Sequence, residues 1–211
     1  IVLIVGTIVI GRQMRYIQTR DPGYARERVV TLPLRRPETR AQAAELREDV
    51  RMDPNVIDAA VSGRLPTDFG GPVRFSLATE AGEAVEMRCV HVPIDERFLD
   101  LYAIPIVEGR NFRPLEAGSA LINETLVRAM GWTRPLGKTI QLQGRIKMTV
   151  VGVVRDFHFA SLHAPIGPLI LASAKRGAGD FLSVKIYPGD YAKSQAGLKR
   201  AYEGRIKGEP F

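Results

Sequence analysis

Residues 150–154 constrain the fold of this chain most, because an uninterrupted apolar run leads there into a loop of aromatic, acidic and histidine residues. Val150, Val151, Val153 and Val154 are β-branched, which predicts a strand. The loop behind it extends to residue 166 and reads Arg-Asp-Phe-His-Phe-Ala-Ser-Leu-His-Ala-Pro-Ile. A loop of this composition after a strand is the first candidate for an active site.

Metal binding is the first chemistry to weigh for this loop. Asp156 and His158 are two positions apart, so both side chains lie on the same side of an extended segment. A catalytic metal site usually has a third protein ligand, and His163 reaches the pair only if the loop folds back. The pattern favours packing of Phe157 and Phe159, with Asp156 and His158 hydrogen-bonded to the loop backbone. We expect no metal site.

Candidate nucleophiles and acid–base groups are also weak. Ser161 lies near two histidines but lacks a nucleophile-elbow pattern. Cys89, the only cysteine, lies in the middle of a predicted strand without a basic neighbourhood that would activate it. Glu80, Glu83 and Glu86 lie in and after a hairpin turn, which is typical of a solvated edge rather than of paired catalytic carboxylates. We therefore expect no catalytic residues and no enzyme activity.

A phosphate-binding loop is suggested by Gly137-Lys138-Thr139. The motif needs a glycine five positions before Gly137, where this chain has Trp132. Residues 139–142 alternate as in a strand, so no helix N-terminus faces a phosphate. We expect neither nucleotide nor any other cofactor to bind here.

The first ten residues are almost entirely apolar but too short to span a bilayer, which takes about 20 residues. We interpret them as the end of a transmembrane helix that continues to about residue 19, with Asp21-Pro22-Gly23 ending it. A trimmed signal peptide and a buried first strand are the alternatives.

The basic residues lie close to this apolar end. Residues 12–36 contain seven arginines and two acids, a net charge of +5 within a chain total of +7. A cluster directly behind an apolar run is more typical of a membrane border than of a nucleic-acid surface, which interleaves aromatics. The positive-inside rule, taken alone, favours a cytoplasmic side for these arginines.

The rest of the chain alternates short strands and helices. A strand at 28–34, a helix at 39–51 and a strand at 56–61 form a compact βαβ unit. Thr39 is the expected helix cap; Ala43, Leu46 and Val50 form its buried stripe, and Arg47, Glu48 and Arg51 are expected to face solvent.

Later segments repeat this plan around an insertion. Residues 73–78 and 85–89 alternate as a hairpin, and the apolar phase flips at Cys89, which predicts a bulge. Asp95 is the expected cap of a short helix, and Asn123 that of a second one. Asn123 also begins an Asn-Glu-Thr glycosylation sequon. Strands at 119–122, 139–142, 147–154, 169–173 and 182–187, followed by a helix at 191–206, complete the chain.

Several short motifs resemble, in order, the extracytoplasmic (periplasmic) core domain of MacB-like/FtsX-like ABC transporter permeases. None is specific alone, but together they cover nearly the whole chain. They are residues 13–18, 21–24, 98–99, 102–104, 108–112 (Glu-Gly-Arg-Asn-Phe), 123–124, 137–138, 151–154 and 156–159.

The resemblance implies an α+β fold of two subdomains, a porter-like pair of βαβ-type halves with a mixed, mainly β subdomain inserted between them. The expected divisions are 1–23 for the helix end and linker, 24–66 and 166–211 for the two porter-like halves, and 67–165 for the insertion. A hinge between the subdomains is expected to be mobile.

The resemblance also implies a function. The domain would lie on the periplasmic side of the bacterial cytoplasmic membrane, without catalytic residues of its own, and couple an ABC ATPase to export. The implied partners are that ATPase, a second permease copy, the membrane and an extracytoplasmic protein, but no nucleic acid. An FtsX-like regulator of a cell-wall hydrolase is the alternative.

Overall fold

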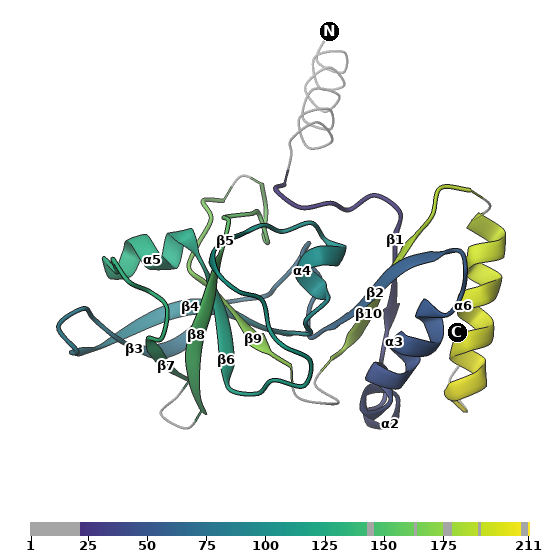
Figure 1. Ribbon diagram of the computed structural model, residues 1–211, viewed down its shortest axis with the longest axis horizontal. Coiled ribbons are helices and arrows are strands. Elements are labelled where there is room, and N and C mark those ends of the chain that lie inside the picture. Colours follow the sequence, from purple (N-terminus) through teal and green to yellow (C-terminus); the bar gives the residue numbers. More distant parts are fainter. Residues whose placement is uncertain (1–21, 143–145, 163, 175–178, 190, 208–210) are drawn as a thin grey trace, which may run out of the picture.

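The computed structural model describes residues 22–142, 146–162, 164–174, 179–189, 191–207 and 211. In these residues the chain forms an α+β structure whose strands join into one ten-stranded sheet. Figure 1 shows its two parts, a ring of strands and a smaller sheet beside helices. The predicted α+β class is confirmed. No helix in the described ranges combines the length and apolar character needed to cross a bilayer, and the apolar residues 1–10 lie outside these ranges.

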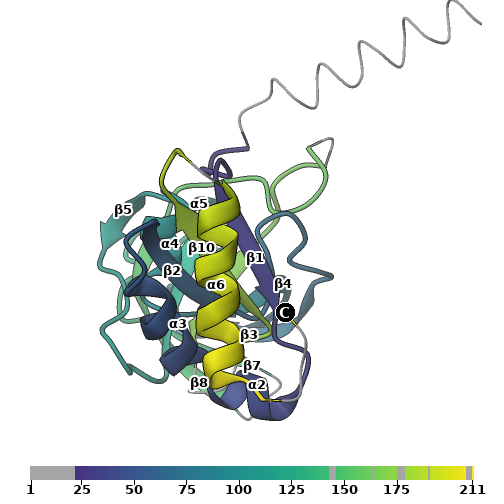
Figure 2. The ribbon, with the colours of Figure 1, turned by 90° about the vertical axis from the view of Figure 1, so that its right-hand side faces the viewer.

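The small sheet has the strand order β1-β10-β2, and β10 runs antiparallel to both neighbours. Helices α3 and α6 lie side by side over the sheet (Figure 2), and their buried side chains join those of the strands in one core. The bounds of these elements are β1 Val29–Pro33, α2 Pro37–Ala41, α3 Ala43–Arg51, β2 Val56–Ser62, β10 Phe181–Ile186 and α6 Tyr191–Arg205.

The helix expected at 39–51 is divided in two. Gln42 has φ −98° and ψ 6°, so it separates α2 from α3. Thr39 lies inside α2 and is buried, and Arg36 occupies the N-cap position before Pro37. Proline fits the first turn because it has no N–H to leave unpaired. The predicted stripe of Ala43, Leu46 and Val50 is buried, as expected from its helical spacing.

The strand ring consists of six strands that pair in a closed circuit, β4-β3-β7-β8-β6-β9 and back to β4. Apolar side chains fill it, and Trp132 belongs to this core and donates from Nε1 to the carbonyl of Ala78 at 2.8 Å. A further strand, β5, pairs with β8. The bounds are β3 Val73–Ala78, β4 Ala84–Ile94, β5 Ile106–Gly109, β6 Ser119–Asn123, β7 Thr139–Leu142, β8 Ile146–Val154 and β9 Leu169–Ser173.

Strand β4 passes between two cores, and this replaces the predicted bulge. Its pairing with β3 is in regular register up to Cys89, and its pairing with β9 is regular from Val90 onward. Cys89 belongs to the core inside the strand ring, whereas Val90 and Val92 belong to a second core outside it. The apolar phase therefore flips because both faces of the strand are covered, not because a residue is inserted.

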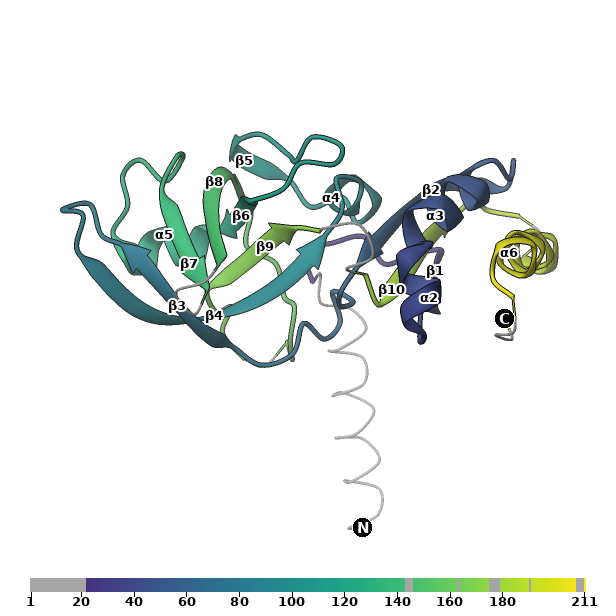
Figure 3. The ribbon, with the colours of Figure 1, turned by 90° about the horizontal axis from the view of Figure 1, so that it is seen from below.

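The two parts meet where β2 and β4 pair through Ser62 and Ile94. Figure 3 shows the strand ring at one end, helix α6 at the other and the small sheet between them. The short helix α4, Phe98–Leu101, packs into the core between them. Strand β9, assigned above to the second porter-like half, pairs with β6 and β4 instead of the small sheet. The second half thus contributes β10 and α6, and the domain boundaries stay a prediction.

Candidate functional site

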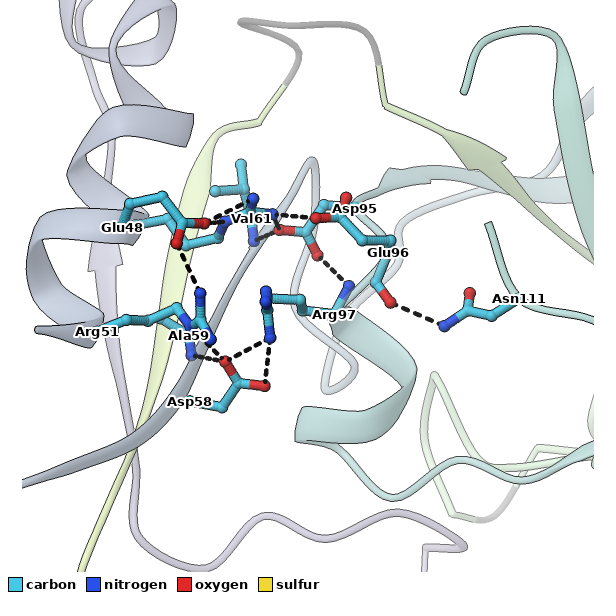
Figure 4. Close-up of polar contacts among 10 residues, drawn as sticks. Glu48, Arg51, Asp58, Ala59, Val61, Asp95, Glu96, Arg97 and Asn111 are labelled. Atoms are coloured by element: carbon cyan, nitrogen blue, oxygen red, sulfur yellow. Dashed lines mark hydrogen bonds and ion pairs between the residues drawn. The ribbon is translucent and has the colours of Figure 1, made fainter. Parts of the chain in front are cut away.

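A network of ion pairs crosses from helix α3 to the β4–α4 connection (Figure 4). Arg47 Nη1 donates to Asp95 Oδ2 at 2.7 Å and lies 3.0 Å from Glu96 Oε1. The same Asp95 oxygen accepts the Val61 N–H at 2.7 Å. The Arg47 side chain is only 12% exposed and Asp95 8%. Arg47 was expected to face solvent, so this buried contact corrects that prediction.

The network continues across strand β2. Arg51 Nε donates to Asp58 Oδ1 at 2.9 Å, and Arg51 Nη1 to Glu48 Oε2 at 2.6 Å. Arg97 approaches Asp58 from the α4 side at 3.4 Å. Glu48 closes the chain by accepting from Arg47 Nε at 2.9 Å. We call these seven residues, Arg47, Glu48, Arg51, Asp58, Asp95, Glu96 and Arg97, the junction network.

Burial shapes the charges at the centre of the junction network. Burial raises the pKa of Asp95, and hydrogen bonds from Val61 and Arg47 offset only part of that effect. Burial would lower the pKa of Arg47, but its bond to Asp95 and the nearby Glu96 and Glu48 raise it overall. Arg47 thus stays charged and stabilises the carboxylate of Asp95. Removing either partner would leave a buried charge without compensation, which is strongly destabilising.

A cluster of aromatic side chains lies beside the junction network and receives the N-terminal linker, residues 22–28. Tyr24 makes edge-to-face contacts with Tyr102 and Phe157, each at 6.0 Å between ring centroids. Phe69 stacks on Phe159 at 5.7 Å. Such pairs add to the free energy gained by burying their area. The cluster comprises Tyr24, Phe69, Phe98, Tyr102, Phe157 and Phe159.

Backbone contacts fix the linker on this cluster. The carbonyl of Pro22 accepts from the N–H of His158 at 2.8 Å, and the N–H of Ala25 donates to the carbonyl of Tyr102 at 2.7 Å. Gly23, at φ +83°, lies so close to Phe157 that a Cβ there would be 3.1 Å from the Phe157 Cβ. Only glycine combines this backbone conformation with this close approach.

Tyr102 extends the connection to the small sheet. Its hydroxyl donates to Ser183 Oγ on β10 at 2.9 Å, with both residues buried. Lys185, also on β10, donates to the carbonyl of Leu101 at 3.3 Å. Linker, strand ring and small sheet therefore meet around α4.

The loop after β8 has a structural role in the described residues. Asp156 accepts from the N–H and hydroxyl of Thr125 at 3.0 and 2.8 Å and from Arg128 at 2.6 Å. It therefore binds the first turn of α5, Glu124–Met130, and not the loop backbone as predicted. Phe157 and Phe159 are buried, as expected. His158 lies at the surface of the linker contact, and His163 lies outside the described residues.

The remaining candidates, Cys89, Glu80 and Lys138, lie in separate structural environments. Burial raises the pKa of the Cys89 thiol to about 12, so the thiol stays protonated. Glu80 accepts from Lys138 Nζ at 2.8 Å and from the N–H of Thr133 at 2.8 Å. This contact occupies the lysine of the phosphate-loop-like motif. Within the described residues, no three His, Cys, Asp or Glu side chains gather where they could hold a metal ion.

The Asn123 sequon is explained by a helix cap. Asn123 is fully buried, and its Oδ1 accepts from the N–H groups of Leu126 at 3.1 Å and Leu169 at 2.9 Å. Its Nδ2 donates to the carbonyl of Gly167 at 3.0 Å. Glycan attachment requires an exposed amide, so the folded chain cannot carry a glycan here.

The Glu108-Gly109-Arg110 motif marks a crossing of two backbones. Gly109 on β5 pairs with Gly152 on β8, and a Cβ on Gly152 would lie 2.5 Å from the carbonyl oxygen of Arg110. Arg110 then forms two bonds of 2.8 Å with Glu116, whose pKa this arginine lowers. The motif thus has a structural role: it allows β5 to pair closely with β8 and joins Arg110 to Glu116.

Sequence reasoning missed the junction network. It identified Asp95 only as a helix cap, and this was wrong in position: Arg97 is the N-cap of α4, and Asp95 Oδ1 instead accepts from the N–H of Arg97 at 3.1 Å in the turn before the helix. The available signal was that Arg47 follows the buried Leu46 directly, at the border of the apolar stripe of α3. Its partners are 48 and 49 residues away, beyond what local periodicity can indicate.

Comparisons with known proteins agree with this architecture. The family described as MacB-like periplasmic core domain matches residues 1–198, and no curated protein matches the chain. The periplasmic region of MacB from Actinobacillus actinomycetemcomitans is 12% identical with a TM-score of 0.54, over 76% of this chain and 72% of that one. The extracellular domain of the noncanonic ABC-type transporter YknZ from Gram-positive bacteria is 14% identical with a TM-score of 0.51, over 84% and 90%. The chain belongs to the family of MacB-like periplasmic core domains.

Proposed function

We propose that this domain couples ATPase-driven motion of a membrane permease to export or substrate handling outside the cytoplasmic membrane. The domain itself carries out no chemistry in this proposal. Its task is to convert a displacement at its N-terminal linker into a displacement of the whole domain. The ATPase, as a separate or fused subunit, and the membrane are the partners that this role requires.

The attachment of the linker is the observation that supports the proposal most. The linker is held by backbone hydrogen bonds on both sides of Tyr24, to His158 and to Tyr102. Tyr24 is buried in the aromatic cluster between them. A segment held by its backbone and by a buried side chain cannot be displaced without moving what it contacts, because interiors are close-packed.

The junction network extends this attachment to the rest of the domain. The Arg47–Asp95 pair joins α3 of the small sheet to the connection that leads into α4. Tyr102 and Ser183 join α4 to β10. A displacement at the linker is thereby passed to both parts, which favours motion as one body over the mobile hinge expected from the resemblance.

Purification of the full-length protein from solubilised membranes tests the partner assignment. We expect an ATP-binding subunit in stoichiometric amount, identified by mass spectrometry. A full-length protein with a single membrane anchor and no co-purifying or fused ATPase would contradict the proposal.

Energy transfer in liposomes tests the coupling itself. A dye on Met52→Cys, a highly exposed site at the C-terminal end of α3, reports the distance of this end of the domain from acceptor-labelled lipids, while Cys89 is buried and escapes labelling. We expect ATP to change this distance in the complex with the ATPase, and Gly23→Ala to reduce the change, because a Cβ at this left-handed position is strained and lies tightly against Phe157. Gly71→Ala, at a position with open space, is the matched control. An ATP response unaffected by Gly23→Ala would argue against the linker contact as the route.

A further inference from the structure

A small surface cavity lies between the linker and the loop after β8. Its volume is about 250 Å³, and it is lined by side chains from both segments and from the β2–β3 connection. The lining residues are Pro22, Tyr24, Arg26, Thr67, His158, Ala160, Ser161 and Leu162. The cavity therefore forms only while the linker is docked, since two of its walls belong to different segments.

Three donor side chains from three segments line this cavity. Arg26 comes from the linker, Thr67 from the β2–β3 connection and His158 from the loop after β8. None of these three side chains forms an ion pair or a hydrogen bond with another described residue, although the backbone N–H of His158 donates to the carbonyl of Pro22. No carboxylate is among the lining residues. The cavity thus offers donors and positive charge without an anion of the protein to use them.

We propose that this cavity binds a phosphate monoester that carries an apolar body. A phosphate group has three acceptor oxygens, so the guanidinium, the imidazole and the hydroxyl can each bind a separate oxygen. Arginine forks match phosphate geometry in paired, charge-assisted hydrogen bonds. A neutral imidazole still donates from one ring nitrogen, so the site does not depend on the charge of His158.

The remaining walls define the other half of the ligand. Pro22, Tyr24, Ala160 and Leu162 are apolar or amphipathic and lie around the same cavity. About 250 Å³ accommodates a head group and the first part of an apolar chain, and it is below the range of 300–1,000 Å³ that holds larger ligands. A ligand that bridges Arg26 and His158 stabilises the docked linker, because it adds a contact between the two segments.

Titrations by amide chemical shift test the site on the 211-residue chain in phosphatidylcholine nanodiscs. The probes are inorganic phosphate, glycerol 3-phosphate and dihexanoyl phosphatidic acid. We expect saturable shifts at the amides of residues 23–26 and 158–162. We expect Arg26→Gln and His158→Gln each to weaken binding about tenfold, as loss of one hydrogen bond to a charged group does. Arg74→Gln, an exposed arginine on the β3–β4 hairpin, is the matched control and leaves the affinity unchanged.

The probes distinguish the source of the phosphate. Tighter binding of phosphatidic acid than of glycerol 3-phosphate supports the proposal and assigns the site to a lipid head group. Equal binding of all three probes would overturn the proposal, because the apolar walls would then contribute nothing. Thermal unfolding of each variant controls for loss of the fold. The proposal is overturned if no probe gives saturable shifts. It is also overturned if the Arg26→Gln and His158→Gln variants fold and bind the probes as tightly as the unchanged chain does.

Discussion

At the scale of single residues, Leu115 combines two unfavourable properties. It has φ +60°, a left-handed conformation that costs a residue with a Cβ about 1 kcal/mol, and its side chain is 87% exposed. We predict that Leu115→Gly raises the free energy of unfolding by about 0.5 kcal/mol, because the strain relieved exceeds the entropy that glycine adds to the unfolded chain. Urea denaturation measures this.

Met52 provides the matched control for Leu115. It is 86% exposed but has φ −74°, an ordinary helical conformation. Met52→Gly should therefore lower the stability by about 0.5 kcal/mol, because it adds entropy to the unfolded chain and relieves no strain. If both glycine variants change the free energy of unfolding in the same direction, backbone strain at Leu115 does not determine the effect of Leu115→Gly.

Substitutions in the Arg47–Asp95 pair should lower the free energy of unfolding by a large and non-additive amount. Arg47→Met removes the charge opposite a buried carboxylate, and we expect it to cost about 3 kcal/mol of unfolding free energy. The double variant with Asp95→Asn should recover part of this loss, because asparagine brings no charge that needs a partner and can still accept from Val61. A double-mutant cycle in urea measures the coupling; a coupling near zero would mean that the pair is not held together in solution.

Glu80 and Glu116 should make the stability of the folded chain sensitive to acid. Lys138, with the N–H groups of Thr133 and Arg134, lowers the pKa of Glu80 from 4.5 to about 2, and Arg110 lowers that of Glu116. A depressed folded-state pKa gives stability that is complete above the unfolded value near 4.5 and is lost as the pH falls through the folded value. The melting temperature should therefore decrease as the pH is lowered below 4.5. This decrease should be less steep in Glu80→Gln and in Glu116→Gln. An unchanged slope in both variants would contradict the assignment.

At the scale of elements, β5 depends on a glycine of β8. An added methyl group on Gly152 would meet the carbonyl oxygen of Arg110, which cannot move without breaking the β5–β8 pairing. We expect Gly152→Ala to cost about 2 kcal/mol, as overpacking does. Gly71→Ala, where nothing lies within 4 Å, should be neutral. Hydrogen exchange at Gly109 and Arg110 locates the damage; exchange unchanged at both would place it elsewhere.

Most elements were predictable, because their patterns are local. The hairpin of β3 and β4, the cap at Asn123 and the buried stripe of α3 follow directly from alternation, capping chemistry and helical spacing. The prediction of a bulge at Cys89 was wrong, because a phase flip also arises when a strand passes between two cores. The sequence does not indicate which core covers each face of the strand. The same holds for Arg47, since burial of a charge depends on a partner from another element.

The site was predictable only in part. The residue pattern predicted that the Asp156–His158 loop would be structural, and the contact of Asp156 with α5 agrees with this, although Asp156 was expected to bind the loop backbone. The partner of Asp156 could not be derived, because Thr125 is 31 residues away in sequence. The place where the linker docks was also not predictable, since it depends on Tyr24 meeting residues from α4 and the loop after β8.

At the scale of the whole molecule, the shared core predicts cooperative unfolding. The core around α4 contains residues of both the small sheet and the strand ring, among them Ala60, Phe98 and Leu171. The fluorescence of Trp132, the only tryptophan, reports on the strand ring, and far-ultraviolet circular dichroism reports on the helices of the small sheet. We expect both signals to change at the same urea concentration. Separate midpoints would show that the two parts unfold independently and would contradict motion as one body.

The closure of β9 onto β4 has a consequence for the folded chain at high concentration. A sheet that returns on itself leaves no row of unpaired N–H and C=O groups to capture a strand from another molecule. Two of the remaining edges are blunted, since β1 ends in Pro33 and β5 has only four residues. Aggregation through the strands of the ring is therefore disfavoured even when many copies lie close together.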